Sequence, residues 1–341
     1  MSPLIRSRRQ LLGGLAACAL AGPALAKKPQ HVGGIKRMDA RLDAIIDPSQ
    51  PIEILSEGYR WAEGPVWVER GGYLLFSDVP ANVAYRWSSG RGVQPFLTPS
   101  GLAGAIPPGV REAGSNGLAI DGAGRLVLAD SGTRAIATID LATRRKMILV
   151  DRYEGKRFNS PNDLAIARSD AIYFTDPPYG LDNGDESPLR ELSFNGLYRL
   201  APDGSLALLD GSHRRPNGVA LSPDERTLYL ALSEEKRPEV LAYSLDARGF
   251  PTGMRRFRDM RSELKMGWPG LPDGIKCDPA GNVFATGPGG LHVCSREGQL
   301  LGIVMTGKPI ANCAFGEDGR SLFLTSSDML ARIRLKRGRG R

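Results

Sequence analysis

Residues 157–179 read RFNSPNDLAIARSDAIYFTDPPY, and this stretch holds the pattern that decides the fold. Two short apolar runs, which begin at Leu164 and Ile172, are separated by a polar turn, an arrangement typical of a β-hairpin. Asn162 and Asp163 place an amide and a carboxylate side by side at the entrance of the first run. The fold class that the sequence predicts depends on whether this hairpin occurs once or is repeated along the chain.

The same two-run pattern occurs six times along the chain. The copies start 39 to 56 residues apart, and their entrance residues are Glu63, Asn116, Asn162, Asn217, Asp273 and Asn312. Room for two more strands follows the hairpins, for example at 135–141, 196–200, 240–245 and 291–294. Four-stranded units at a period near fifty residues predict an all-β, six-bladed β-propeller over residues 51–335. A β-sandwich would not repeat one motif six times.

Residues 1–26 have the features of a twin-arginine-type signal peptide. Arg8 and Arg9 precede an apolar run from Leu11 that ends in an Ala-Leu-Ala cleavage site at 24–26. The run is short and interrupted by glycines, so it is too weak to form a stable membrane span. Residues 15–18, which end in Cys18, also resemble a lipoprotein attachment box, and this alternative stays open. We expect export to the periplasm by the twin-arginine route.

Two further segments flank the propeller. Residues 27–50 are polar and are expected to form a loose N-terminal arm or an edge segment, and residues 336–341 form a basic C-terminal tail. The formal net charge is +8, but the signal and the tail supply seven of the basic residues. Without them, 38 Lys and Arg stand against 37 Asp and Glu. A nearly neutral body argues against a nucleic-acid partner. We expect a monomer or a weak oligomer.

The six entrance residues are predicted to form a ring. In a propeller the innermost strand of each blade runs beside the axis, so its entrance lies at one mouth of the central channel. All six side chains carry oxygen, whereas isolated Asn or Asp at such positions would only form local turns. The long connections 99–114, 151–161 and 254–272 are predicted to wall the same mouth, with help from 159–161 and 177–179.

Several kinds of chemistry are disfavoured by what the sequence lacks. The sequence contains neither a histidine pair nor a C-x-x-C motif, so a zinc site with nitrogen and sulfur ligands is disfavoured. The histidines, His31, His213 and His292, are far apart in the sequence. There is no G-x-S-x-G elbow and no strand–G-x-G-x-x-G–helix unit. The cysteines of the mature chain, Cys277, Cys294 and Cys313, fit buried positions, and one disulfide among them stays open.

Hard oxygen ligands are the chemistry that remains. Two carboxylates and several amide oxygens that converge on one point suit Ca²⁺, with Mg²⁺ or Mn²⁺ as alternatives. Because the protein would fill only part of the coordination shell, water and substrate could bind to the same ion. The ring therefore indicates metal-assisted hydrolysis, and the alternative is a structural ion that closes the channel.

Five motifs of this chain resemble those of the senescence-marker-protein (regucalcin)/gluconolactonase family, especially its bacterial gluconolactonase branch. The resemblance covers residues 50–335 and rests on Glu63-Gly-Pro-Val-Trp67, Asn159-Ser-Pro-Asn-Asp163, Phe174-Thr-Asp-Pro-Pro-Tyr-Gly180, Pro216-Asn-Gly218 and Pro272-Asp-Gly274. It implies a six-bladed propeller that hydrolyses sugar lactones with one divalent metal ion, with calcium expected and magnesium, manganese or zinc as alternatives.

The resemblance also implies roles for individual residues. Glu63, Asn217 and Asp273 match metal ligands, and Asn162 matches a fourth ligand or a substrate contact. Asp273 also matches the general base that activates water, and Asn116 is expected to contact substrate. One departure is the segment Asp130-Ser-Gly-Thr-Arg134, where bacterial gluconolactonases often carry a histidine. This departure leaves gluconolactone itself unassigned as the substrate.

Two other functions are kept as hypotheses beside the lactonase. Related propellers with a similar calcium site cleave organophosphates, so a phosphotriesterase-like hydrolase would use the same residues. A non-catalytic binding propeller with a structural ion would hydrolyse neither kind of ester.

Overall fold

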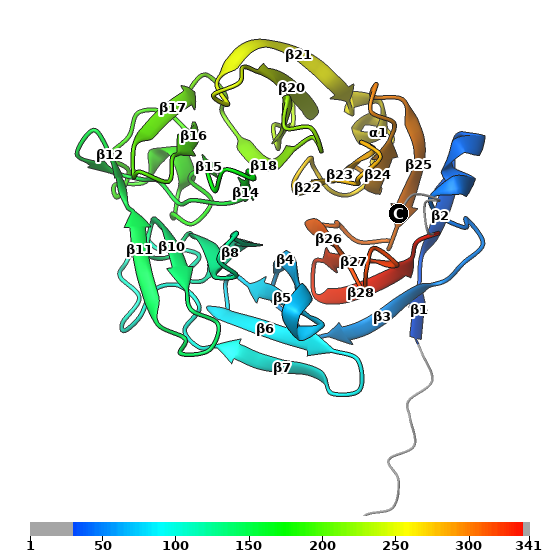
Figure 1. The fold of residues 1–341 in the computed structure, drawn as a ribbon, viewed down its shortest axis with the longest axis horizontal. Coiled ribbons are helices and arrows are strands. Elements are labelled where there is room, and N and C mark those ends of the chain that lie inside the picture. Colours follow the sequence, from blue (N-terminus) through cyan, green and yellow to red (C-terminus); the bar gives the residue numbers. More distant parts are fainter. Residues whose placement is uncertain (1–29, 337–341) are drawn as a thin grey trace, which may run out of the picture.

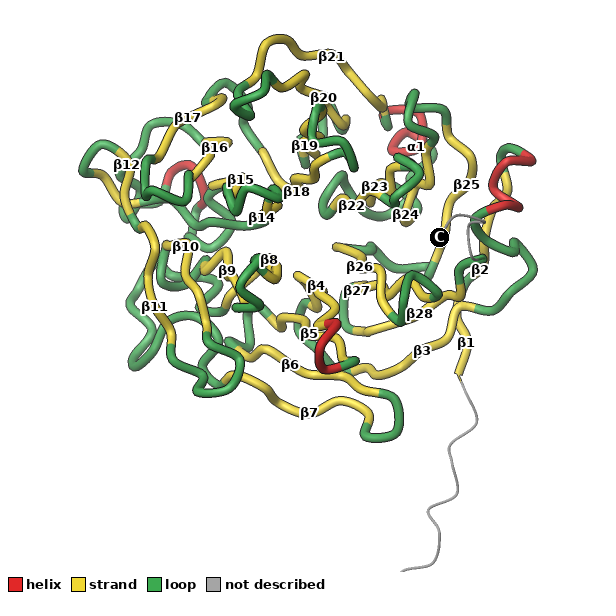
Figure 2. Tube along the Cα trace, in the orientation of Figure 1, coloured by secondary structure: helices red, strands yellow, loops and turns green. Residues whose placement is uncertain are grey.

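Six antiparallel sheets are arranged radially around one axis, with the first strand of each hairpin pair innermost (Figure 1). This computed structural model describes residues 30–336. The predicted signal peptide with Cys18, and the tail beyond Lys336, lie outside these residues, so periplasmic export stays a prediction. The predicted all-β, six-bladed propeller is confirmed, and strands dominate the chain (Figure 2).

The first four blades follow one another along the chain, each with its strands in sequence order. Blade 1 contains β4 (Ala62–Val68), β5 (Tyr73–Asp78), β6 (Val83–Ser88) and β7 (Gly92–Leu97). Blade 2 contains β8 (Ser115–Ile120), β9 (Leu126–Asp130), β10 (Ala135–Ile139) and β11 (Lys146–Val150). Blade 3 contains β14 (Leu164–Ile166), β15 (Ile172–Asp176), β16 (Gly196–Leu200) and β17 (Leu206–Asp210). Blade 4 contains β18 (Pro216–Leu221), β19 (Thr227–Leu232), β20 (Glu239–Leu245) and β21 (Pro251–Asp259).

The last two blades are completed by the N-terminal segment. Blade 5 contains β22 (Ile275–Cys277), β23 (Val283–Gly287), β24 (Gly290–Cys294) and β25 (Leu300–Met305), and β2 (Gly34–Arg37) adds a fifth strand. Blade 6 contains β26 (Asn312–Gly316), β27 (Ser321–Ser326) and β28 (Met329–Arg334), to which β3 (Ile52–Glu57) and β1 (Gln30–Val32) are added. Because β3 pairs with β28, an early and a late strand of the described residues close the ring.

The N-terminal segment was predicted to form either a loose arm or an edge segment, and residues 30–50 form the edge segment. Strands β1 and β2 pair with β3 and β25, and a 3₁₀ helix, η1 (Ala40–Ala44), follows them. Leu42 and Ile46 are fully buried among the side chains of blades 5 and 6. These two apolar residues anchor a stretch that otherwise looks polar.

The hydrophobic core is divided into six clusters, one between each pair of neighbouring blades. In β9, for example, Leu126 and Leu128 pack toward blade 1, whereas Val127 and Ala129 pack toward blade 3. Both faces of the strand are therefore apolar, since side chains alternate between the faces of a sheet. With the apolar side chains placed between blades, the axis is left to the polar residues at the strand entrances.

Many entrance residues are followed by a glycine, and the packing of adjacent inner strands explains why. A Cβ atom on Gly218, which follows Asn217, would lie 1.9 Å from the carbonyl oxygen of Asp273 in the next blade. A Cβ atom on Gly64, which follows Glu63, would likewise lie 1.9 Å from the carbonyl oxygen of Asn116. The missing side chain lets adjacent inner strands approach closely, and this approach brings the entrance residues together.

Gly218→Ala is expected to lower the free energy of unfolding by about 1–3 kcal/mol, the usual cost of overpacking. The reason is that β18 must move away from β22 to admit the methyl group. Urea unfolding measures the effect. The control is Gly253→Ala on the outer strand β21, where nothing lies within 4 Å of the added Cβ. Equal losses in the two variants would contradict the close-approach explanation.

Other segments lie outside the blades. A short hairpin, β12 (Arg152–Tyr153) with β13 (Lys156–Arg157), occupies the connection between blades 2 and 3. Single turns of helix are η2 (Glu69–Gly71), η3 (Gly184–Glu186) and α1 (Arg261–Lys265). No helix within residues 30–336 is long and apolar enough to cross a membrane.

Candidate active site

Five of the six predicted ring residues line a single cavity of about 1340 Å³ at one mouth of the propeller. These residues are Glu63, Asn116, Asn162, Asn217 and Asp273, each from a different blade. Each stands at the start of an inner strand or one or two residues before it, so the radial arrangement of the blades points them toward one space. Glu63, Asn116, Asn162 and Asn217 are at most 5% exposed, and Asp273 is partly open to the cavity.

The two carboxylates of this set are neighbours in the cavity. Glu63 is close enough to Asp273 to raise the pKa of its carboxyl, and Asp163 is a third acid close to both. Burial, reinforced by the charge of Asp163, raises the pKa of Glu63 to about 7. Burial and the charges of Glu63 and Asp163 raise the pKa of Asp273 well above its ordinary value. Buried acids that repel each other in this way are stabilised by a bound cation.

Asn217 offers an oxygen with the right properties for such a cation. Its side-chain Nδ2 donates a hydrogen bond of 2.8 Å to Ser233 Oγ, which orients the amide. Its Oδ1 is buried and has no hydrogen-bond partner among the described residues. A buried acceptor without a partner is costly, and a metal ion or a donor group of a ligand would satisfy it. The residues present therefore fit a divalent ion that takes oxygen ligands.

The acids alone do not form a metal site. Within residues 30–336 no three His, Cys, Asp or Glu side chains are placed so as to hold an ion. An ion in this cavity would need the amides of Asn162 and Asn217 in addition to Glu63 and Asp273. This mixed set is the one expected from the sequence, and it suits Ca²⁺ better than metals that prefer nitrogen and sulfur.

Asn312, the sixth ring residue, does not line the cavity. Its Oδ1 accepts a hydrogen bond of 2.9 Å from the next backbone N–H, that of Cys313, so its side chain forms the local turn considered as the alternative. Its Nδ2 donates to Glu63 Oε2 at 3.2 Å. Asn312 therefore helps to hold the Glu63 carboxylate in place.

Two residues near the acids were missed by the sequence reasoning. Burial raises the pKa values of Glu63 and Asp163, and the positive charge of Lys276 partly offsets this rise. Lys276 Nζ also donates to Asn312 Oδ1 at 3.1 Å. Asp163 was noticed only as the neighbour of Asn162. The signal for Lys276 is its place as the one charged residue in the short strand β22.

The walls of the cavity agree only in part with the predicted loops. Segment 99–114 contributes Arg111 and Glu112, and segment 254–272 contributes Trp268 among others. However, 254–259 belongs to the outer strand β21, so only its later part is a loop. Segment 151–161 contributes nothing, because it folds into the β12–β13 hairpin.

Connections between the second and third strands of a blade supply the walls that were missed. The antiparallel neighbour of an inner strand ends at the same mouth where the inner strand begins. The connection 177–195 therefore brings Tyr179 to the cavity, and 233–238 brings Ser233 and Lys236. The cavity is not lined by the other predicted wall residues, 159–161, Pro177 and Pro178. Asn159 and Ser160 instead donate backbone hydrogen bonds to buried Asp176.

The departing segment 130–134 supports the Asn162 loop from behind. Ser131 Oγ donates to the carbonyl oxygen of Pro161 at 2.8 Å, and Arg134 Nε donates to that of Phe158 at 2.6 Å. Asp130 is fully buried and pairs with Lys146. None of these residues lines the cavity.

The histidines and cysteines take no part in the cavity. His213 contacts Tyr243 and Asp210, and buried His292 contacts the carbonyl oxygen of Pro288. His31 lies on the edge strand β1. The cysteines at 277, 294 and 313 are all free, so the described residues contain no disulfide.

The fold and the cavity together define a six-bladed β-propeller with carboxylates and amides gathered at one mouth of its axis. The SMP-30/Gluconolactonase/LRE-like region family matches residues 61–328. The chain belongs to this family.

Individual relatives agree with this assignment. The chain is 49% identical over 309 residues to a gluconolactonase of Zymomonas mobilis, which covers 89% of this chain and 87% of the relative. The solved structure of a gluconolactonase from Xanthomonas campestris superposes with a TM-score of 0.78 at 33% identity, over 92% of this chain and 99% of that one. A calcium-binding regucalcin from Agrobacterium tumefaciens superposes with a TM-score of 0.65 at 21% identity, over 83% and 94% of the two chains, and shows the shared fold.

Proposed function

We propose that this protein is a metal-dependent lactonase that opens aldonolactones to the corresponding hydroxy acids. The observation that carries the proposal is the meeting of Glu63, Asp273 and the unpartnered amide oxygen of Asn217 in one cavity. Membership of the SMP-30/gluconolactonase family supports the reaction type, because the relative with 49% identity is named a gluconolactonase.

The donor set proposed for the ion is Glu63, Asn162, Asn217 and Asp273. Calcium is the expected ion, with magnesium, manganese or zinc as alternatives. When bound, a divalent cation supplies a Lewis acid that polarises the lactone carbonyl and lowers the pKa of water. Asn116, at the same mouth, is proposed to contact the substrate.

Asp273 is proposed as the general base. It is the acid of the set that stays partly open to the cavity, so water can approach its carboxylate. The carboxylate accepts a proton from the water that attacks the carbonyl carbon. The proton then passes to the ring oxygen as the C–O bond breaks, so that one water adds and one hydroxy acid leaves.

Tyr179 is suited to bind the substrate. Its hydroxyl is buried next to Asp273, Asn217 and Ser233. It makes no well-aligned hydrogen bond with any described residue. Burial raises the pKa of Tyr179, so the hydroxyl stays protonated and remains a donor. It can donate a hydrogen bond to an oxygen of the bound lactone.

The test is an assay of the purified protein, freed of metal with a chelator and then supplied with Ca²⁺, Mg²⁺, Mn²⁺ or Zn²⁺. We expect hydrolysis of at least one aldonolactone, restored by one or more of these ions. Turnover of a phosphotriester without any lactone turnover would instead favour the phosphotriesterase-like alternative. If neither substrate is hydrolysed and the metal only raises the melting temperature, the propeller is a binding protein with a structural ion.

A further inference from the structure

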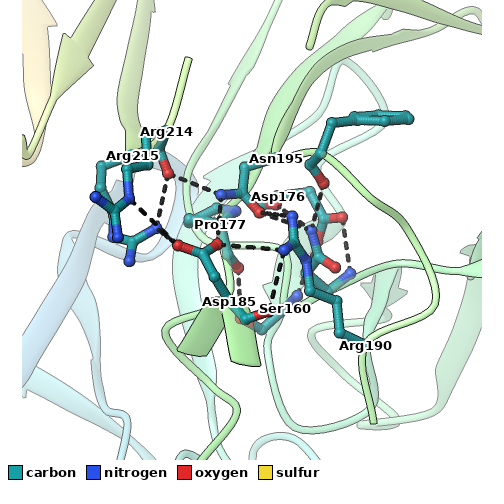
Figure 3. Close-up of polar contacts among 10 residues, drawn as sticks. Ser160, Asp176, Pro177, Asp185, Arg190, Asn195, Arg214 and Arg215 are labelled. Carbon is teal, nitrogen blue, oxygen red and sulfur yellow. Dashed lines mark hydrogen bonds and ion pairs between the residues drawn. The ribbon is translucent and has the colours of Figure 1, made fainter. Parts of the chain in front are cut away.

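Three arginines surround the carboxylate of Asp185 where the connection between β15 and β16 meets the residues that precede β18 (Figure 3). Arg215 Nη1 lies 2.5 Å from Asp185 Oδ2, and Arg214 Nε lies 3.5 Å from the same oxygen. Arg190 Nη1 lies 3.5 Å from Asp185 Oδ1. Asn195 Nδ2 adds a hydrogen bond of 3.0 Å to Oδ1. We call Arg190, Arg214, Arg215 and Asp185 the arginine cluster.

The arginine cluster carries more positive charge than its carboxylate can balance. Asp185 stays ionised, because hydrogen bonds from Asn195 and Arg215 and the charges of the arginines outweigh its burial and hold its pKa below the ordinary value. One negative charge therefore faces three guanidinium groups. The side chains of Arg190, Asp185 and Arg215 are only 15%, 18% and 22% exposed, so water compensates the charge of Arg190 and Arg215 poorly, whereas Arg214 is 67% exposed and well solvated. An uncompensated, half-buried charge is costly unless a further anion binds there.

Two arginines of the cluster, Arg214 and Arg215, line the cavity. The Nε and Nη2 groups of Arg215 have no hydrogen-bond partner within residues 30–336, because only Nη1 is used, for Asp185 and the carbonyl oxygen of Arg214. Arg215 lines the same cavity as the proposed ligand set. It is close enough to the Tyr179 hydroxyl to affect its pKa, as are Asp273 and Asn217.

Other acids that line the cavity do not cancel this charge. Glu234 and Glu235 lie on the blade 4 wall and form no ion pair with the arginine cluster, and Glu112 pairs with Arg111 at 3.1 Å. Arg60 and Lys236, which also line the cavity, are matched in number by Glu234 and Glu235, so the positive excess is confined to the arginine cluster. The positive excess therefore lies beside the proposed reaction centre, whose own two acids would be engaged by the metal ion.

The cavity also has room for more than a plain sugar lactone. Its volume of about 1340 Å³ exceeds the roughly 300–1,000 Å³ of pockets that bury a drug-sized ligand. A lactone ring held by its carbonyl near Asn217 and Asp273 would leave space for a substituent that reaches Arg215.

We propose that the preferred substrate is a lactone that carries a second, anionic group, a carboxylate or a phosphate, recognised by Arg215 with support from Arg214. This inference rests on the proposed lactonase function and narrows its substrate class. Guanidinium groups bind both anions through paired N–H donors, and Asp185 pre-orients Arg215 for this contact. Arg190 is buried behind them and acts as a positioning residue.

The test compares kcat/KM for a neutral aldonolactone, for the lactone of an aldaric acid and for an aldonolactone 6-phosphate. We expect the wild-type protein to prefer at least one anionic lactone over the neutral one by about tenfold or more, and to lose much of this preference at high salt. The anion that is preferred identifies the chemistry as carboxylate or phosphate.

Arg215→Met should reduce kcat/KM for the preferred anionic lactone by about tenfold more than for the neutral lactone. Arg296→Met is the matched control, since this arginine is 68% exposed in the turn between β24 and β25 and should change neither value. A neutral lactone that is hydrolysed as well as both anionic ones would overturn the inference and leave the lactonase proposal intact. If Arg215→Met lost kcat/KM equally on the anionic and the neutral lactone, the inference would likewise be overturned and the lactonase proposal would stand.

A binding measurement separates the two proposals completely. The hydroxy-acid products can be titrated against the tryptophan fluorescence of the protein, because Trp61 and Trp268 line the cavity. An aldarate or a 6-phosphoaldonate should bind more tightly than the neutral-chain aldonate in the wild type, and not in Arg215→Met. If no lactone is hydrolysed, the lactonase proposal fails, and this titration still decides whether the cavity prefers a second anion.

Discussion

Asp273→Asn is expected to reduce kcat for lactone hydrolysis by about a thousandfold or more. General base catalysis alone accounts for about 10²–10⁴-fold, and the variant also loses one anionic ligand of the proposed ion. Asparagine keeps the size and shape of the side chain, so the cavity should stay intact. The measurement is kcat at saturating metal, with circular dichroism to check the fold.

This variant also has an expected effect on stability that a merely misfolded protein would not show. Asp273 lies beside Glu63 and Asp163, whose charges repel its own, so removing its charge removes repulsion from the metal-free protein. The metal-free variant should therefore unfold at the same or a higher denaturant concentration than the metal-free wild type. Asp170→Asn is the control, because this exposed residue holds a turn at φ 61°, which asparagine also adopts, and should change neither activity nor stability. Wild-type activity in Asp273→Asn would refute its role as the base.

The sequence was enough to predict the propeller because its repeat has a physical cause. Each inner strand must pass close to the next, and the glycine after Glu63 or Asn217 is what permits this approach. The motif therefore marks the same place in most blades, and it can be recognised without an alignment. Blade 6 was harder to foresee, since its outer strands come from the other end of the chain and sequence order says nothing about that pairing.

The candidate site was predicted less completely than the fold. Asn312 occupies the same repeat position as Asn217, but its amide turns back to its own backbone, and only the packed structure shows which way a side chain turns. Lys276 and Asp163 matter because they lie near Glu63 in space. Asp185 and Arg215 are 30 residues apart in the sequence and meet only because two connections end at the same mouth of the propeller.

Metal removal is expected to abolish lactone hydrolysis and to lower the melting temperature by roughly 5 °C or more. An ion present at 100 times its dissociation constant stabilises a folded protein by about 2.7 kcal/mol. For a domain larger than 150 residues each kcal/mol corresponds to roughly 2–4 °C. The physical source is the repulsion among Glu63, Asp163 and Asp273, which a cation held by Glu63, Asp273 and the amides of Asn162 and Asn217 would relieve.

The measurement is a thermal melt and an activity assay of chelator-treated protein, before and after titration with each divalent ion. Glu63→Gln should lose both the stabilisation by metal and the activity, because it removes an anionic ligand while keeping the shape that Asn312 contacts. Glu69→Gln, an exposed residue of the same blade, should behave like the wild type.

The two readouts of this experiment distinguish the roles that an ion could have. Loss of activity together with the thermal shift, both restored by the same ion at the same concentration, indicates one site that serves catalysis and stability. A thermal shift that Glu63→Gln leaves unchanged would place the ion elsewhere in the molecule. Full activity with an unchanged melt after chelation would show that the buried acids of this cavity work without a metal, and the donor set proposed from Glu63, Asn162, Asn217 and Asp273 would then be wrong.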